Sequence, residues 1–191
     1  PFLFIPGQTT MHTTRLKKNF DKKDFQTGAS IFKQASWYLI SLLLFRSGVI
    51  PFSSLLVILL RCFGAQIGKN VRIKPHIYIK YPWKLTIGDH SWLADCYIEN
   101  LNHVHIGAHV CISQRAMLLT GNHDYRSPEF DLITKPILIE NGAWICANST
   151  VGPGVRAGTG SVLIAGSVAT TDLASNAIYR GNPARVKRKR Y

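Results

Sequence analysis

The first candidate for chemistry in this 191-residue sequence is a histidine at the start of a polar stretch. Asp124 follows His123 directly, and the stretch HDYRSPEFDLITKP contains two prolines, which are typical of a loop. An imidazole titrates near neutral pH, so it can accept a proton from a hydroxyl group as a general base. An ordinary surface histidine is the alternative. Asp124 could orient the imidazole or cap the loop.

A six-residue repeat of apolar residues, starting at Ile67, predicts the elements that position this loop. A helical face does not have this period, and the glycines and proline between 152 and 160 would disrupt a helix. A six-residue unit cannot bury its own apolar side chain, so the units must stack as a β-solenoid. The repeat positions are Ile67, Ile73, Ile79, Ile87, Leu93, Ile106, Ile112, Leu118, Ile139, Ile145, Val151, Ala157 and Leu163.

Shifts in the phase of the repeat place extra residues near 80–86, near 99–105 and between 119 and 138. The last insertion is the longest, and we expect it to protrude as a loop over about 124–136. Loops held by a rigid scaffold often carry function. In an uninterrupted coil of eighteen residues, His105 would lie one coil beneath His123, about 4.8 Å away along a parallel ladder.

The segment before the repeat is strongly apolar, and Arg46 and the SGVIP sequence divide it into two pieces. We predict two helices, at about 29–46 and 52–63. They could pack against the solenoid, or lie in the plane of a membrane surface with the flanking lysines and arginines toward anionic lipid, or do both. No cleavable secretion signal is expected, because the first apolar stretch, PFLFIP, is short and has no basic leader.

The positive charge is concentrated at the two ends of the chain. The formal net charge is +13, of which residues 1–66 carry +6, residues 67–179 carry +1 and residues 180–191 carry +6. We therefore expect an N-terminal arm and helical segment (1–66), a nearly neutral catalytic solenoid (67–179) and a basic C-terminal tail (180–191). Basic ends suit nucleic acid, anionic lipid or a phosphorylated ligand. The basic runs lack interleaved aromatic residues, which argues against nucleic acid.

Four segments carry a resemblance to a known family: KYPWKL (80–85), LLTGNHDYRSPEFDLITKPI (118–137), GAWI (142–145) and GNPARV (181–186). They resemble hexapeptide-repeat acyltransferases, in particular the colanic-acid-biosynthesis branch. The resemblance implies a mainly β fold, a left-handed parallel β-helix that assembles as a homotrimer with active sites between subunits. It also implies an acetyl-CoA-dependent O-acetyltransferase acting on a saccharide hydroxyl, with His123 as the general base. A small non-sugar acceptor, such as serine or an antibiotic, and a non-catalytic basic binding solenoid are the alternatives.

The resemblance also implies roles for individual positions. The spacing of His103, His105 and His109 does not match that of zinc-binding carbonic anhydrases on the same β-helix, so we expect no metal. The four cysteines form no CxxC pair and indicate a reducing compartment, so we expect a cytoplasmic protein, with contact to the inner membrane face as the further option.

Thr171 stands where the family often has lysine, and Asp95 where it often has asparagine. The implied cofactor contacts are Ala147, Ala165, Thr170 and Arg185, and the implied acceptor contacts are Asp95, Asp124 and Trp144.

Overall fold

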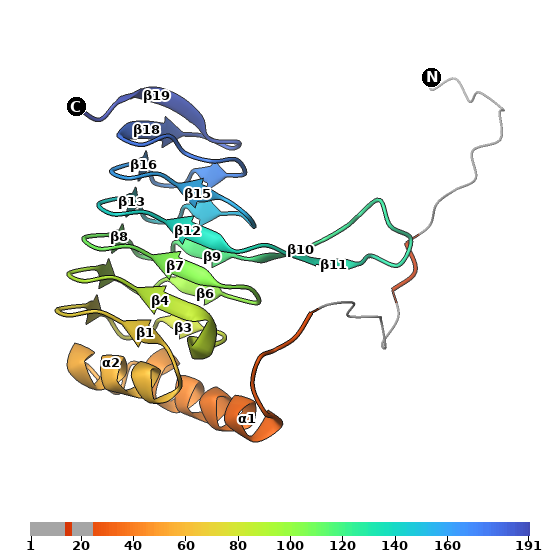
Figure 1. Ribbon diagram of the computed structural model, residues 1–191, viewed down its shortest axis with the longest axis vertical. Coiled ribbons are helices and arrows are strands. Elements are labelled where there is room, and N and C mark those ends of the chain that lie inside the picture. Colours follow the sequence, from red (N-terminus) through yellow and green to blue (C-terminus); the bar gives the residue numbers. More distant parts are fainter. Residues whose placement is uncertain (1–13, 17–24) are drawn as a thin grey trace.

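The structure, a computed structural model, describes residues 14–16 and 25–191, and its body is a parallel β-solenoid stacked along one axis (Figure 1). Successive short strands join three sheets in turn, named here faces A, B and C. The expected β-helix with two preceding helices is confirmed. Face A contains β1 (Gln66–Ile67), β4 (Leu85–Ile87), β7 (Val104–Ile106), β12 (Ile137–Ile139) and β15 (Arg156–Ala157). Face C contains β3 (Tyr78–Ile79), β6 (Tyr97–Glu99), β9 (Met117–Leu119), β14 (Thr150–Val151) and β17 (Val168–Ala169).

Face B is the longest sheet because the C-terminal strands extend it. The segment expected as a basic tail is part of this sheet, since β18 pairs in parallel with β16 and β19 turns back antiparallel to β18. Ala184 between them is buried, and its N–H donates to the Val168 carbonyl, which fixes the turn. Face B contains β2 (Arg72–Ile73), β5 (Trp92–Leu93), β8 (Cys111–Ile112), β13 (Trp144–Ile145), β16 (Val162–Leu163), β18 (Ala177–Arg180) and β19 (Arg185–Lys189).

The repeat residues form the core of the solenoid. Every repeat position named above is at most 2% exposed except Ile67 in the first coil, which is half-buried. Equivalent residues stack in register between coils, as in Ile87 against Ile106 and Ile106 against Ile139. The six-residue period therefore reports one inward side chain per side of the triangle, and burial of these ladders stabilises the stack.

Two helices close one end of the core. Helix α1 (Ile31–Ile40) continues into the wider π-helical turns of η1 (Ser41–Arg46), and α2 (Ser53–Cys62) follows; all lie beneath the first coil (Figure 1). Trp37 and Phe45 are buried against the coil, and the Trp37 indole N–H donates to the Ile79 carbonyl at 2.9 Å. Within the described residues, no helix combines the length and apolar character that crossing a bilayer would require.

The long insertion is a two-stranded antiparallel arm, and it begins earlier than the loop predicted at 124–136. Strand β10 (Gly121–His123) pairs with β11 (Leu132–Thr134), and this arm projects sideways from the edge between faces C and A (Figure 1). Because the arm takes His123 out of the coil, the predicted stacking on His105 is wrong. His105 instead pairs with Thr86 and Leu138 on face A.

Candidate active site

His123 ends strand β10, where the arm leaves the solenoid, and its imidazole has a defined environment. The imidazole Nδ1 lies 2.8 Å from the carbonyl oxygen of Phe130, and the Phe130 ring stacks on the imidazole with 4.4 Å between centroids. Phe130 has a positive φ of 53°, a backbone conformation that only the surrounding turn makes tolerable for a bulky residue. The arm thus fixes both the plane and the rotation of the imidazole.

This contact decides which imidazole nitrogen carries the proton. A carbonyl oxygen only accepts hydrogen bonds, so Nδ1 must donate to the Phe130 carbonyl. The neutral imidazole then carries its lone pair on Nε2. A histidine held in this tautomer is a ready proton acceptor at Nε2, which is what general-base catalysis requires.

Asp124 caps the turn of the arm. Its Oδ1 accepts the Arg126 N–H at 2.9 Å, and its own N–H donates to the Asp131 carbonyl at 2.8 Å. Of the two roles left open by the sequence, capping is the one these contacts serve, and the Phe130 carbonyl supplies the orienting hydrogen bond to His123.

Two residues anchor the arm where it leaves the solenoid. The buried Thr120 hydroxyl donates to the Glu99 carbonyl at 2.9 Å and accepts the Asn102 N–H at 3.0 Å. A methyl group added at Gly121 would lie 2.6 Å from Leu101 Cδ1, closer than real contacts allow. The start of β10 therefore packs closely against the Leu101 side chain, where the arm carries His123 away from the solenoid.

A separate cavity of about 660 Å³ lies along the edge between faces B and C. Small side chains form its floor, because Ala147 and Ala165 occupy equivalent corners of neighbouring coils. Trp144, which is 44% exposed, borders it, and the Trp144 indole N–H donates to the Ser113 hydroxyl at 2.9 Å. At its C-terminal end the cavity is lined by Arg180, Lys187 and Arg188. A narrow floor of alanines with a basic end suits a long, thin ligand that ends in phosphates.

Cys146 lines the same cavity, but its thiol is not a nucleophile at neutral pH. Burial raises the pKa of the Cys146 thiol to about 11, so the thiolate is scarce. A covalent intermediate on this cysteine is therefore disfavoured.

The predicted site residues fall on two different edges of the triangle. Asp95 lies on the B–C edge with Ala147 and Ala165, because Ala94 and Asp95 turn the corner between β5 and β6. Thr170 follows β17 on the C–A edge, the edge from which the arm leaves. One six-residue side, up to roughly 20 Å long in extended form, separates the two edges. Within one protomer, His123 and the cavity therefore lie on different edges of the solenoid.

Sequence comparison with known proteins identifies the family. WcaF of Escherichia coli K12, which is named as a colanic acid biosynthesis acetyltransferase, is 47% identical over 133 residues, 69% of this chain and 73% of its own length. The chain belongs to the hexapeptide-repeat acetyltransferases. Galactoside O-acetyltransferase of the same strain is 32% identical over 65% of this chain and 64% of that protein. No family model matches the chain.

Solved structures agree with this acetyltransferase assignment. A hexapeptide-repeat-containing acetyltransferase from Vibrio cholerae superposes with a TM-score of 0.75 at 26% identity, over 84% of this chain and 92% of that chain. A galactoside acetyltransferase, solved in complex with coenzyme A, superposes with a TM-score of 0.72 at 26% identity, over 84% of this chain and 82% of that chain. The resemblance to the colanic-acid-biosynthesis branch is confirmed by the identity to WcaF.

Arg185, like Thr170, is a predicted cofactor contact that lies outside the lining of the cavity on the B–C edge. It is exposed at the start of β19, and its Nη1 donates to the Ala184 carbonyl at 3.3 Å. Sequence reasoning placed a basic cluster here but could not choose its members, because the reversal at Asn182–Ala184 and a bulge at Ile178 and Tyr179 set which side chains of β19 reach the cavity.

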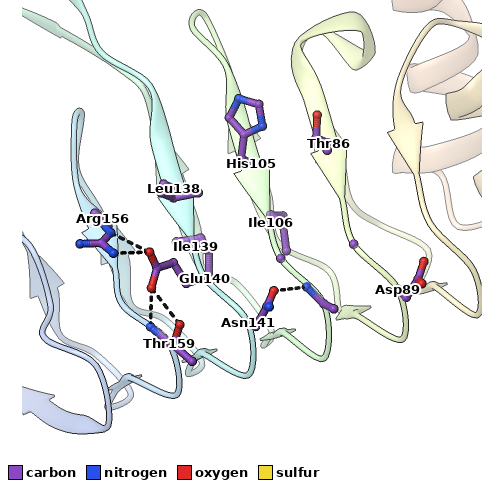
Figure 2. Close-up of a pocket in the computed structure, with 13 residues that line it drawn as sticks. Thr86, Asp89, His105, Ile106, Leu138, Ile139, Glu140, Asn141, Arg156 and Thr159 are labelled. Carbon is purple, nitrogen blue, oxygen red and sulfur yellow. Dashed lines mark hydrogen bonds and ion pairs between the residues drawn. The ribbon is translucent and has the colours of Figure 1, made fainter.

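A larger cavity, of about 830 Å³, lies on face A of the acetyltransferase (Figure 2), and its lining includes neither Trp144 nor a residue of β10 or β11. Its polar side chains are bonded to each other across coils. Glu140 accepts from Arg156 at 2.7 Å and from the Thr159 N–H and hydroxyl at 2.8 and 2.9 Å, and these hydrogen bonds lower the Glu140 pKa. We interpret this network as a structural tie between coils.

Several other histidines of the described chain have local structural contacts. His90 and His109 adopt positive φ at equivalent corners, and their rings stack at 4.9 Å. Desolvation, together with His105 and Lys84, lowers the pKa of His103. Among the residues that the structure describes, no three histidine, cysteine or carboxylate side chains gather as a metal site would need.

Proposed function

We propose that this acetyltransferase transfers the acetyl group of acetyl-CoA to a hydroxyl group of a saccharide, with Nε2 of His123 as the general base. The hydrogen bond from His123 Nδ1 to the Phe130 carbonyl carries the proposal, because it leaves the lone pair on Nε2 at the base of a projecting arm. A hydroxyl group has too high a pKa to ionise unaided near neutral pH, so it needs such a base.

The proposed reaction balances with this one residue. Nε2 accepts the hydroxyl proton while the acceptor oxygen forms a bond to the thioester carbonyl carbon. The resulting oxyanion collapses, the carbon–sulfur bond breaks, and the imidazolium returns its proton to the CoA thiolate. The Phe130 carbonyl stabilises the imidazolium that forms, because its hydrogen bond with Nδ1–H strengthens when the ring is charged.

The cavity on the B–C edge is the proposed site for acetyl-CoA. Ala147 and Ala165 leave room for the thin pantetheine chain, and Arg180, Lys187 and Arg188 can pair with the nucleotide phosphates. Thr170 and Arg185 remain predicted contacts from the family resemblance. Coenzyme A in the related galactoside acetyltransferase supports a donor of this kind.

A saccharide is the acceptor class that the side chains and relatives favour. Trp144 presents an exposed aromatic face, which suits the apolar face of a sugar ring, and Asp95 offers a carboxylate for sugar hydroxyls. The names of two relatives, a colanic acid biosynthesis acetyltransferase and a galactoside O-acetyltransferase, point the same way.

We further propose a homotrimer in which the arm of one protomer completes the cavity of the next. The base and the cavity lie on opposite edges of face C, so a rotation between protomers would bring them together. The exposed residues of faces B and C include Trp92 and Met117, whose apolar side chains suit such an interface. We place the reaction on the cytoplasmic side, consistent with the free cysteines of the described chain.

An acceptor panel with acetyl-CoA tests the proposal. The purified chain is incubated with mono- and oligosaccharides, serine and aminoglycosides, and mass spectrometry detects a mass gain of one acetyl group on the acceptor. We expect transfer to a saccharide hydroxyl and its loss by about a hundredfold or more in His123→Ala. The matched control is His105→Ala, an exposed histidine on face A, which should retain activity. Full turnover by His123→Ala would refute the role of the base, and acetylation of serine alone would refute the acceptor class.

A further inference from the structure

We propose that the helical cap, defined as residues 31–62, docks the protein onto an anionic membrane surface. This inference concerns a surface that the proposed reaction does not use. It rests on three features of the cap: its exposed apolar face, the charge around it and the way it is attached to the solenoid.

The cap is apolar on the face turned away from the solenoid as well as on the buried one. Trp37, Ser41 and Phe45 point into the protein, four residues apart. Leu39 and Leu43 lie on the opposite side of the same helix and are 56% and 60% exposed. A helix on the surface of a water-soluble protein normally carries polar residues on its outward face. The exposed apolar side chains of the cap are Ile31, Phe32, Tyr38, Leu39, Leu42, Leu43, Val49, Phe52, Leu55 and Ile58.

The charge at this end of the molecule is mainly positive. Residues 25–88, which contain the cap, the first coil and the first strand of the second coil, include eight lysines and arginines and no aspartate or glutamate. Arg46 and Arg61 lie on the cap, and Lys69 and Lys74 lie on the exposed first coil. Asp89 accepts the Lys69 N–H and Glu99 pairs with Lys80, but the cap itself carries no carboxylate. An apolar face with an excess of positive charge around it matches the arrangement of helices that lie in the headgroup region of anionic bilayers.

The cap is firmly joined to the first coil, so its outer face is presented as a fixed surface. The Ser53 hydroxyl accepts the Ile73 N–H at 2.8 Å, and the His76 N–H donates to the Phe45 carbonyl at 2.8 Å. Gly48, with φ of +73°, leaves space for the His76 ring, which a side chain at 48 would overlap. Both helices lie across the end of the solenoid rather than along it, so the bilayer would meet them side-on (Figure 1).

The charge argues against a second copy of this chain as the occupant. Two caps packed face to face would bring Arg46, Arg61 and Lys69 of both copies together with no carboxylate from residues 25–88 to pair with them. An anionic lipid surface supplies the missing negative charge and an apolar layer at once.

Flotation of the full chain with lipid vesicles tests the proposal. We expect binding to phosphatidylcholine vesicles that contain about one third phosphatidylglycerol, at least about tenfold weaker binding to pure phosphatidylcholine, and weakening by salt. The variant Leu39→Gln/Leu43→Gln should bind at least about tenfold more weakly, because two exposed leucines no longer enter the bilayer. The variant Lys69→Gln/Lys74→Gln should bind the anionic vesicles more weakly, and its binding to pure phosphatidylcholine should be unchanged.

The control is Leu138→Gln/Val186→Gln, which makes the same kind of change at exposed apolar residues on face A and on β19, far from the cap. It should bind vesicles as the parent chain does. If the double leucine variant unfolds, Phe52→Gln, at a residue 68% exposed, replaces it. Unchanged binding by a folded cap variant, absence of vesicle binding by the parent chain, or a doubled solution mass that the cap variant abolishes would each overturn the proposal. Acetyl transfer to a soluble acceptor is measured in parallel, so a failure here is distinct from a failure of the proposed reaction.

Discussion

The proposed trimer, with the proposed base on one edge of the solenoid and the proposed cofactor cavity on another, makes a quantitative prediction about mixed assemblies. His123→Ala removes the base on the arm, and Ala165→Phe fills the cavity on the B–C edge. Each variant alone should be nearly inactive, because a trimer of either kind lacks one half of every site. A mixed trimer differs, because an intact cavity of the His123→Ala protomer can meet an intact arm of the other protomer.

The expected activity follows from the order of protomers around the ring. In a trimer with two copies of one variant and one of the other, only one of the three interfaces joins an intact cavity to an intact arm. Mixed trimers selected by two affinity tags should therefore show about one third of parental activity, and an unselected equal mixture about one quarter. The assay is thiol release from acetyl-CoA with the acceptor found by the panel, on co-expressed chains whose native mass confirms the trimer.

Baseline activity in the doubly tagged trimers would refute the shared site. It would mean that His123 and the cavity of one protomer act together, without an interface between protomers. The control is a mixture of tagged parental and His123→Ala chains, in which activity should follow the fraction of intact arms whichever chain provides the cavity.

Three further perturbations test the arm and the coil network. Phe130→Ala keeps the carbonyl that holds His123 but removes the stacked ring, so we expect kcat to fall about tenfold with little change in KM for acetyl-CoA, measured by steady-state kinetics; an equal rise in KM would argue against it. Gly121→Ala places a methyl group 2.6 Å from Leu101 Cδ1, so either the Leu101 side chain or the start of the arm must shift; we expect kcat to fall with little change in melting temperature, and a normal kcat would show that Leu101 moves and the arm does not. The lowered pKa of Glu140 means that its ionised form stabilises the fold above its ordinary pKa near 4.5, and this contribution is lost as pH falls through the lower folded value. Glu140→Gln should therefore be less stable than the parent to urea at neutral pH, and the difference should shrink as the pH falls below 4.5; a difference that stays constant would refute the assignment.

The core was predictable because each six-residue side of a coil contributes one inward side chain, which appears in the sequence as an apolar residue at every sixth position. Each inward position needs an aliphatic side chain and each corner needs a tight turn, so the period of six is set by the geometry of the coil. The same regularity explains the wrong placement of His105. Counting eighteen residues per coil assumes an unbroken stack, whereas residues 120–136 leave the coil, and the ladder passes from His105 to Leu138.

The candidate active site was only partly predictable, because it lies where the repeat is interrupted. The motif around His123 indicated a base, but the group that orients it is a backbone carbonyl, that of Phe130, which no side-chain pattern reveals. Its position depends on a bulky residue at positive φ, a conformation that composition alone would assign to glycine or asparagine. The cavity has a similar origin, since its basic end depends on the reversal of β19 rather than on the number of arginines near the C-terminus. A rigid periodic stack can tolerate such departures because its stability comes from the coils on either side. The arm and the terminal strands can therefore depart from the repeat and form a site without loss of the fold.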